Sequence, residues 1–576
     1  MSRIKILRII TLSALGLITV RLFGIQIIEH DQWVAKANEQ HTLLETITPR
    51  RGEIYMMDGS EPVAVVLNQT TFQVIIDPAV TPKDDLKTTL DKYAKDYITA
   101  NIDDIYNIEG LRYYVVAKNI PYSDASKIAA VGLSGVWLKD GNSRVYPEGE
   151  MASTVLGFVN ADGIGQYGVE GAFNNLLAGK EGLLKTISDI NNVALSIGDD
   201  NIKIPAEDGK NIVLSIDRGL EKGVEELAEK ALSDGEATNA AVLIMKPQTG
   251  EVVAMTTLPN YDPMNYGHVK DASAYVNQVT EVPYEPASIC KNFAYSAAIN
   301  EGKMTPDSTY FNEHYTYVDG WQIWNAERRS SLYGEIDMRK ALFWSLNTGS
   351  IQALRFLGGD PEHINQKGRE LLYDYYHNKF RLGRATGIGL IEAVGYIEDP
   401  NEGWGRDSTY ANMTFGQNLG ITMIQTATAF SAVINGGYWR TPTVVKGTLE
   451  NNQITPIASI NQEIIEERIL SENTSSVMRE MLINNRNYKG DPEGYAVGGK
   501  SGTAQVIRDG AYDDSFAELI GSYIGFIGPS DQLPEYVIMV KMWGEGKSIG
   551  SGDAMGLFDE LSNFAINYLK IKPGGV

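Results

Sequence analysis

The chain is organised around the segment Pro286-Ala287-Ser288-Ile289-Cys290-Lys291-Asn292-Phe293, which continues through residues 294–301 to Gly302. A proline suits the first turn of a helix, and Gly302 is placed to end it. Apolar residues recur at helical spacing between these limits, which predicts a buried helix. A separation of three residues puts Ser288 and Lys291 on one face, with Ser288 near the N-terminus, where backbone N–H groups point outward.

A serine and a lysine one turn apart can act as a nucleophile and its base. The serine hydroxyl is inert until its proton is removed, and a lysine desolvated beside an apolar helix can be neutral enough to remove it. The spacing alone is weak evidence, because Ser2-Arg3-Ile4-Lys5 matches it in a tail with no core. Taken alone, such a pair is usually a solvated helix face.

Two later motifs strengthen the catalytic interpretation. They are Ser345-Leu346-Asn347 and Lys500-Ser501-Gly502, the chain's only K-[S/T]-G. The set S-x-x-K, S-x-N and K-[S/T]-G in this order resembles penicillin-binding proteins and serine β-lactamases. A second S-x-N at Ser471 lies in a polar segment, whereas Ser345 follows the helix-like residues 338–344, so we favour Ser345.

Composition excludes several classes of function. The chain has 576 residues, enough for two or three domains, and a formal net charge of −23 with no basic stripe, which disfavours nucleic acid as a partner. The single cysteine, Cys290, permits no intrachain disulfide and no Cys-based metal site. The six histidines are scattered and match no zinc or triad motif, so we expect no metal and no cofactor.

Cys290 could itself be proposed as a nucleophile. It stands two residues from Ser288 and therefore points to a different helix face. Similar enzymes carry an apolar side chain there. A small buried core residue is the favoured interpretation.

Residues 9–28 are apolar apart from a few small or polar residues and Arg21, and as a helix they would span about 30 Å, the thickness of a bilayer core. We predict one membrane crossing. Three basic residues lie in the tail of residues 1–8, so the positive-inside rule keeps the N-terminus in the cytoplasm and sends the rest outside. Arg21 is unfavourable in mid-membrane unless it snorkels or faces a partner helix.

A cleaved signal peptide is the alternative interpretation of this segment. Bulky residues, Ile25, Ile27 and Ile28, stand where cleavage needs small ones, so an uncleaved anchor is favoured. Residues 29–45 are polar and helix-compatible and are interpreted as a stalk.

Residues 46–205 contain strand and turn signals but no constellation of nucleophile and base. Met57-Asp58-Gly59 is a turn signal, and residues 71–76 form an expected strand. The segments Arg51-Gly52-Glu53-Ile54, Arg144-Val145-Tyr146-Pro147 and residues 165–171 resemble the pedestal motifs of class B penicillin-binding proteins. The resemblance implies a structural, dimerisation-like pedestal domain.

Residues 206–576 predict an α+β domain. Strands are expected at residues 211–217, 240–245, 251–256, 499–507, 523–527 and 536–542, and helices at residues 221–232 and 557–569. Strands at both ends with helices between them imply an antiparallel sheet completed by the C-terminal hairpins. This matches the transpeptidase fold that the motifs imply.

The resemblance assigns a role to each motif residue. Ser288 attacks the carbonyl of a D-alanyl-D-alanine stem peptide, Lys291 takes its proton, and an acyl-enzyme forms. Ser345 would relay protons, Asn347 would hold the substrate amide and Lys291, and Lys500 would keep the electrostatic potential at the relay positive. Ser501 and Thr503 would bind the substrate carboxylate, and Gly502 would allow the substrate backbone to approach closely. The N–H groups of Ser288 and Thr503 would hold the oxyanion. Ala287 departs from the family, which usually has glycine there.

Two other classes of function compete with this one. Residues 494–501 match the phosphate-binding loop G-x-x-x-x-G-K-[S/T], but such a loop must leave a buried strand and enter a helix, whereas residues 502–507 predict a strand. The second is a non-catalytic β-lactam sensor or a scaffold of the wall machinery. A β-lactamase is disfavoured by the anchor, the pedestal and the length.

The resemblance also implies the setting of the reaction. β-Lactams would act as inhibitors, and a SEDS-type membrane glycosyltransferase and other wall-synthesis proteins would be partners. Glu285-Pro286 is more typical of division-type members, with an elongation role as the alternative.

Overall fold

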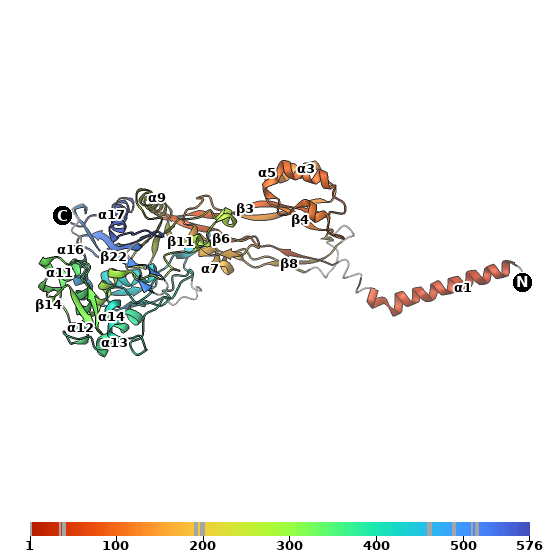
Figure 1. Cartoon of the computed structure of the whole chain (residues 1–576). Helices are drawn as coiled ribbons and strands as arrows, with labels where there is room; N and C mark the ends of the chain where they lie inside the picture. Colours follow the sequence, from red (N-terminus) through yellow and green to blue (C-terminus); the bar gives the residue numbers. More distant parts are fainter. Residues whose placement is uncertain are drawn as a thin grey trace. The chain divides into compact units, whose positions relative to one another are not determined.

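The structure is a computed structural model that describes residues 3–33, 36, 42–188, 194–195, 202–457, 464–485, 491–508, 511–512 and 518–575 (Figure 1). It forms two compact units, each assembled from two separate stretches of chain. One contains Met1–Gly52 and Asn175–Lys210, and the other contains Glu53–Asn174 and Asn211–Val576.

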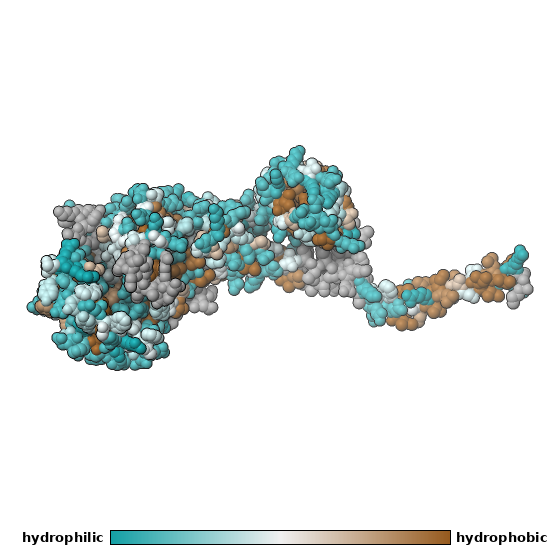
Figure 2. Space-filling model, viewed as in Figure 1, coloured by the Kyte–Doolittle hydropathy of each residue, from teal (hydrophilic) through white to brown (hydrophobic). Residues whose placement is uncertain are grey.

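The first unit contains the predicted anchor. Helix α1 (Arg3–Phe23) continues into a π-helical turn, η1 (Gly24–Ile28), and together they are long and apolar enough to cross a membrane. Figure 2 shows the apolar surface of this helix in brown. The helix begins at Arg3 rather than at residue 9, so the basic tail residues from Arg3 onward are helical as well.

A small antiparallel sheet also belongs to the first unit. Its strands are β1 (Thr42–Ile47), β8 (Gly182–Ser188) and β10 (Ile202–Ile204), with β8 in the middle, and the short β9 (Ala194–Leu195) also pairs with β8. Residues 42–44 are therefore extended, although the sequence there predicts a helix-compatible stalk. Their strand is set by pairing with residues 185–187, a partner that local sequence does not reveal.

The second unit contains the strands of the predicted pedestal. β2 (Ile54–Asp58) and β3 (Glu61–Ile76) form a hairpin around Gly59, which has a φ of +62° as the turn signal predicts. β3 also pairs with β4 (Tyr114–Pro121) and with β5 (Val136–Val145). On its other side, β2 pairs in parallel with β11 (Asn211–Asp217).

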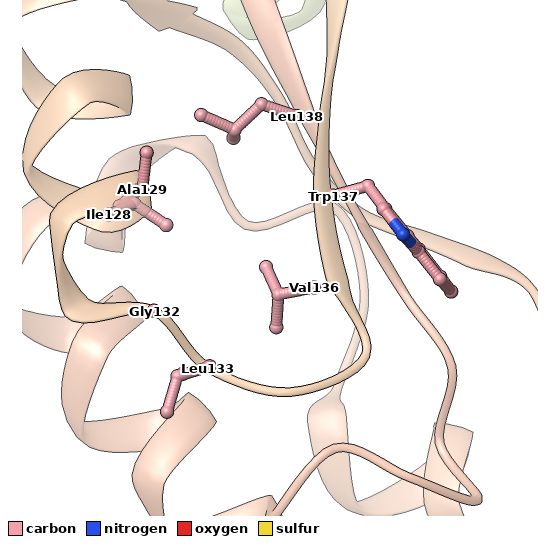
Figure 3. Close-up of a pocket in the computed structure, with 7 residues that line it drawn as sticks. All are labelled: Ile128, Ala129, Gly132, Leu133, Val136, Trp137 and Leu138. Carbon is pink, nitrogen blue, oxygen red and sulfur yellow. The ribbon is translucent and has the colours of Figure 1, made fainter.

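Helices α3 (Lys83–Tyr93) and α5 (Tyr122–Val131) belong to the same apolar cluster as β3 and β4. A cavity of about 320 Å³ lies between the end of α5 and the start of β5 (Figure 3). Val136 and Leu138 point into this cavity, whereas Trp137 points to the other side of the strand. The alternation follows from the period of two in a β-strand.

The sheet that carries Lys500, called the main sheet below, has five antiparallel strands in the described residues. Their order is β13 (Val252–Leu258), β12 (Asn239–Met245), β26 (Tyr536–Trp543), β25 (Leu519–Pro529) and β22 (Tyr495–Gln505). N-terminal and C-terminal strands share this sheet, which confirms the α+β prediction. Residues 495–501 lie within β22 rather than before a helix, so the phosphate-loop alternative is wrong.

Helices cover both faces of the main sheet. α9 (Arg218–Asp234) and α17 (Ser551–Tyr568) pack on one face around a core that includes Val242, Val540 and Phe558. The other face carries α15 (Met423–Ile434) and α16 (Glu472–Asn484), and α10 (Lys291–Asn300) packs against these two helices. Among the strands of the described residues, the edge strand β22 pairs only with β25.

Candidate active site

Ser288 lies in a tight turn that leads into α10. This 3₁₀ turn, η5 (Ala287–Cys290), directly precedes Lys291, whose backbone N–H bonds to the carbonyl of Ser288. With three residues per turn, side chains at i and i+3 align more closely than in the α-helix that the sequence predicts. Ser288 is half-buried while Ile289 and Cys290 are buried, so the serine is the residue of this turn that reaches the surface.

Lys291 is buried within a set of oxygen acceptors. Its Nζ lies 2.5 Å from the Ser345 carbonyl oxygen, 2.9 Å from Asn347 Oδ1 and 3.2 Å from Ser345 Oγ. Burial, followed by the nearby positive charge of Lys500, holds the pKa of Lys291 well below its usual range. A neutral amine at this position can accept a proton.

The Ser345 hydroxyl connects two lysines. Ser345 has a φ of +55° and stands between α11 (Met338–Phe343) and α12 (Asn347–Gly358). Lys500 Nζ donates to Ser345 Oγ at 2.8 Å, and burial lowers the pKa of Lys500 to about 7. Lys291 and Lys500 repel each other when both are protonated, so two positive charges on this pair are disfavoured.

The strand that carries Lys500 alternates as its sequence predicts. Lys500 and Gly502 are buried, Ser501 is half-buried and Thr503 is exposed. A Cβ on Gly502 would lie 2.4 Å from the carbonyl oxygen of Pro286. The backbone that approaches Gly502 is therefore that of Pro286, just before Ser288, whereas the sequence led us to expect the substrate backbone there.

The Ser288 hydroxyl has no hydrogen-bond partner among the described residues, since Lys291 is engaged with Ser345 and Asn347. The structure therefore gathers Lys291, Ser345, Asn347 and Lys500 in one network and puts Ser288 one turn from it. Nucleophile–base hydrogen bonds are often long without substrate and tighten only in the reacting complex.

A second loop supports η5, the turn that carries Ser288 and is called the nucleophile turn after the role expected for that serine. Gly416 has a φ of +81°, and a Cβ there would lie 2.1 Å from the carbonyl of Ala287. The Ala287 N–H donates to Gly416 O at 3.2 Å, and Glu285 Oε1 accepts from the Asn418 N–H at 2.7 Å. The signal for this contact is the F-G-Q-N stretch, in which only glycine fits.

A third buried lysine also escaped the sequence analysis. Lys541 lies on β26, and its Nζ donates to Gln278 Oε1 at 3.1 Å. The Nζ is 4.9 Å from the ring centroid of Tyr284 and 4.5 Å from that of Trp543. Burial lowers the pKa of Lys541 to about 7. A single lysine in an apolar strand gives no signal from which this setting could be predicted.

Two residues compete with the favoured ones in the sequence: Ser471 with Ser345 as the proton relay, and Cys290 with Ser288 as the nucleophile. Ser471 Oγ accepts from the Thr474 N–H and caps α16. Cys290 is completely buried, and burial raises the pKa of its thiol, which disfavours the reactive thiolate. The third alternative, the Ser2–Lys5 pair, cannot be assessed because Ser2 lies outside the described residues.

Comparisons with known proteins cover most of the chain. A family model for the penicillin binding protein transpeptidase domain matches residues 240–561, and one for the penicillin-binding protein dimerisation domain matches residues 46–214. Stage V sporulation protein D of Bacillus subtilis is 27% identical over 545 residues, covering 91% of this chain and 79% of that protein. The peptidoglycan D,D-transpeptidase FtsI of Buchnera aphidicola is 25% identical over 575 residues, covering 97% and 94%.

Solved structures share the fold. A peptidoglycan synthetase from Bifidobacterium adolescentis has a TM-score of 0.70 at 20% identity and covers 93% of this chain and 98% of its own. Penicillin binding protein 2X from Streptococcus thermophilus has a TM-score of 0.66 at 22% identity and covers 93% and 83%. The pedestal and the α+β domain therefore occur together in these structures as well.

Proposed function

Since the chain belongs to the class B penicillin-binding proteins, we propose that it is a serine-type peptidoglycan D,D-transpeptidase with Ser288 as its nucleophile. The observation that carries the assignment of residues is the network around Ser345 Oγ, which accepts from Lys291 and from Lys500. A hydroxyl between a neutral amine and a charged one can pass a proton in either direction.

Acylation begins when Ser288 Oγ attacks the carbonyl of the penultimate D-alanine and Lys291 takes the hydroxyl proton. The backbone N–H groups of Ser288 and Thr503 stabilise the oxyanion. The proton then passes from Lys291 through Ser345 to the nitrogen of the terminal D-alanine, which leaves as the C–N bond breaks. An amine of a neighbouring stem peptide attacks the ester, loses its proton by the reverse route and releases Ser288.

The remaining motif residues hold the substrate. Ser501 and Thr503 bind the terminal carboxylate, and Asn347 holds the substrate amide while its Oδ1 orients Lys291. Lys500 keeps the potential positive, and Gly502 allows β22 to pack against the nucleophile turn. A β-lactam enters the same path, because its strained amide acylates Ser288 and no leaving group departs.

The anchor and the relatives indicate where the enzyme works. Basic residues before residue 9 keep the N-terminus in the cytoplasm, and the pedestal and transpeptidase domains (residues 46–205 and 206–576) lie outside. Relatives named FtsI and PbpB support a role in division-type wall synthesis. Glycan polymerisation belongs to a SEDS-type membrane glycosyltransferase that contacts the anchor and the pedestal.

Covalent labelling of the purified full chain with a fluorescent penicillin tests the mechanism. We expect the parent and Cys290→Ala to label and Ser288→Ala to remain unlabelled. If a folded parent does not label, the non-catalytic sensor or scaffold replaces this proposal. If Ser288→Ala labels as the parent does, the nucleophile is assigned wrongly.

A further inference from the structure

A hairpin beside the candidate active site carries an aromatic face. Its strands are β15 (Tyr315–Val318) and β16 (Trp321–Trp324). They are joined by Asp319 and Gly320, with φ values of +51° and +81°. Two successive positive φ angles are typical of a type I′ turn, which fixes the register of a hairpin.

The register places three aromatic residues on one face. Tyr315 pairs with Trp324 and Tyr317 pairs with Gln322, so these four side chains share a face. The ring of Tyr315 lies 4.9 Å from that of Trp324 and 5.7 Å from that of Tyr317. Tyr317 is 60% exposed and Trp324 is 41% exposed. We call Tyr315, Tyr317, Gln322 and Trp324 the aromatic strip.

The opposite face anchors the hairpin to the domain. Val318 is buried, and Thr316 Oγ1 accepts from Arg355 of α12 at 2.9 Å. At the turn, Asp319 Oδ2 accepts from the Ser408 N–H at 2.8 Å. The hairpin is therefore fixed from behind, and packing does not account for the exposed rings of the strip.

The strip begins at the active site. The carbonyl of Trp324 accepts from Asn347 Nδ2 at 2.9 Å, and the Oδ1 of the same Asn347 accepts from Lys291. Next to Trp324, the buried Asn325 accepts from the Thr348 N–H at 2.9 Å. These bonds hold the strip in a fixed position relative to Asn347.

We propose that the aromatic strip is a subsite for a sugar ring of the glycan to which the stem peptide is attached. A pyranose presents a face of C–H groups, whose partial positive charge is attracted to the negative face of an aromatic ring. The Gln322 amide and the Arg328 guanidinium, which lies 4.7 Å from the Trp324 ring, supply hydrogen bonds to hydroxyl and acyl groups.

The alternative occupant, a protein, fits less well. A stable protein–protein contact covers about 800 Å² per partner, far more than the four side chains of one hairpin face. The subsite rests on the proposed function, because it is the stem peptide in the active site that brings the sugar to the strip.

The kinetic test uses the purified full chain and two donor substrates: a pentapeptide linked to its N-acetylglucosamine–N-acetylmuramic acid disaccharide, and the same pentapeptide without sugar. Release of D-alanine gives kcat/KM for each. We expect the parent to prefer the sugar-linked donor, and Tyr317→Ala to lower this preference about fivefold to tenfold, as truncation of a central aromatic contact does. Trp321→Ala, a 72% exposed tryptophan outside the strip, is the matched control and keeps the parental preference.

A binding experiment tests the strip without catalysis. Saturation-transfer NMR with the free disaccharide should show contact with the parent and with Trp321→Ala, and lose it in a Tyr317→Ala, Gln322→Ala double variant. The proposal is overturned if the parent neither prefers the sugar-linked donor nor contacts the disaccharide, or if Tyr317→Ala and Trp321→Ala behave alike. A parent that contacts the disaccharide but is not acylated by penicillin supports the strip and refutes the proposed function.

Discussion

Lys291 and Lys500 form one buried pair of like-charged groups, and Glu221 and Glu225, one turn apart on α9, form another. The lysines share the hydroxyl of Ser345. Glu221 accepts from the Met255 N–H at 2.7 Å and from Thr256 Oγ1 at 2.8 Å, and Glu225 accepts from the Ala152 N–H at 2.8 Å.

The difference lies in the partner. A hydroxyl can both donate and accept, so the lysine pair can transmit a proton. The two glutamates have separate partners, the Met255 N–H and the Thr256 hydroxyl for Glu221 and the Ala152 N–H for Glu225, so this pair holds β13 and the segment before α6 (Ser153–Leu156) in place. Burial shifts the pKa of both pairs toward the neutral form, lowering that of the lysines and raising that of the carboxylates. A buried pair of like-charged side chains can therefore serve either proton transfer or stability of the fold. Which of the two it serves depends on the groups to which the pair is hydrogen-bonded.

Removal of Lys291, the proposed base, should have the largest effect and should separate the lysine pair from the glutamate pair by its effect on acylation. Lys291→Ala is expected to slow penicillin acylation by about 10³-fold, within the range for loss of a general base. The measurement is the second-order rate constant of acylation. Lys541→Met, which removes another buried lysine outside the Ser345 network, is the control and should lose far less. Equal losses in the two variants would mean that any buried lysine matters only for packing.

Loss of the shared hydroxyl should have the next largest effect. Ser345→Ala leaves Lys291 bonded to the Ser345 carbonyl and to Asn347 but removes the path to Lys500, so we expect acylation to slow by about 10²-fold. The same rate constant reports it, with the cap variant Ser471→Ala as the matched control. A Ser345→Ala enzyme that acylates at the parental rate would exclude the relay.

The carboxylate pair should respond in stability rather than in rate. Glu221→Ala leaves the Met255 N–H and the Thr256 hydroxyl without their acceptor, which is expected to lower the free energy of unfolding by about 3 kcal/mol. Thermal unfolding measures it, and the exposed Glu226→Ala on the same helix is the control. Parental stability together with slowed acylation would reverse the assignment of the two pairs.

The two pairs should also give opposite pH dependences of stability. Above pH 4.5 an unfolded glutamate has lost the proton that buried Glu221 and Glu225 retain, so the free energy of unfolding falls as pH rises toward their raised pKa. Between about pH 7 and 10.5, unfolded lysine keeps a proton that buried Lys500 has lost, so stability rises with pH.

Each group contributes a slope of up to about 1.4 kcal/mol per pH unit. The free energy of unfolding should be measured across pH in two variants. The double variant Glu221→Gln, Glu225→Gln should show a smaller fall of this free energy in the acidic range, and Lys500→Met should show a smaller rise in the alkaline range. An unchanged acidic slope in the glutamine variant would show that the carboxylates ionise normally in the folded chain.

The smallest effect is expected at Ala287. Its φ of +49° lies in the left-handed region, which favours the glycine usual in the family. Ala287→Gly relieves this strain but gives the unfolded chain more freedom, so we expect a change in unfolding free energy below about 1 kcal/mol. A thermal scan measures it, with Ala298→Gly within α10 as a destabilising contrast. A large loss in Ala287→Gly would show that the methyl group packs in the nucleophile turn.

Much of the fold follows from local pattern. The strand at residues 211–217 has the predicted limits, strands β12, β25 and β26 extend their predictions by one to four residues at an end, and β13 begins one residue and ends two residues later than predicted. Alternation and apolar runs suffice there, because the strands are buried in a sheet. The pairing of β1 with β8, about 140 residues later, could not be predicted, since strand partners are set by long-range contacts.

The sequence by itself determined the motif residues, the membrane-spanning helix and the α+β class, because spacing and hydrophobic period are properties of the chain. Only the tertiary structure decided that Ser345 lies between Lys291 and Lys500. It also decided that contacts with the nucleophile turn require glycine at 502 and 416, and that Asn347 is hydrogen-bonded to Trp324 of the hairpin of residues 315–324. Hydrogen bonds and close backbone contacts between segments far apart in sequence depend on folding, so no local pattern encodes them.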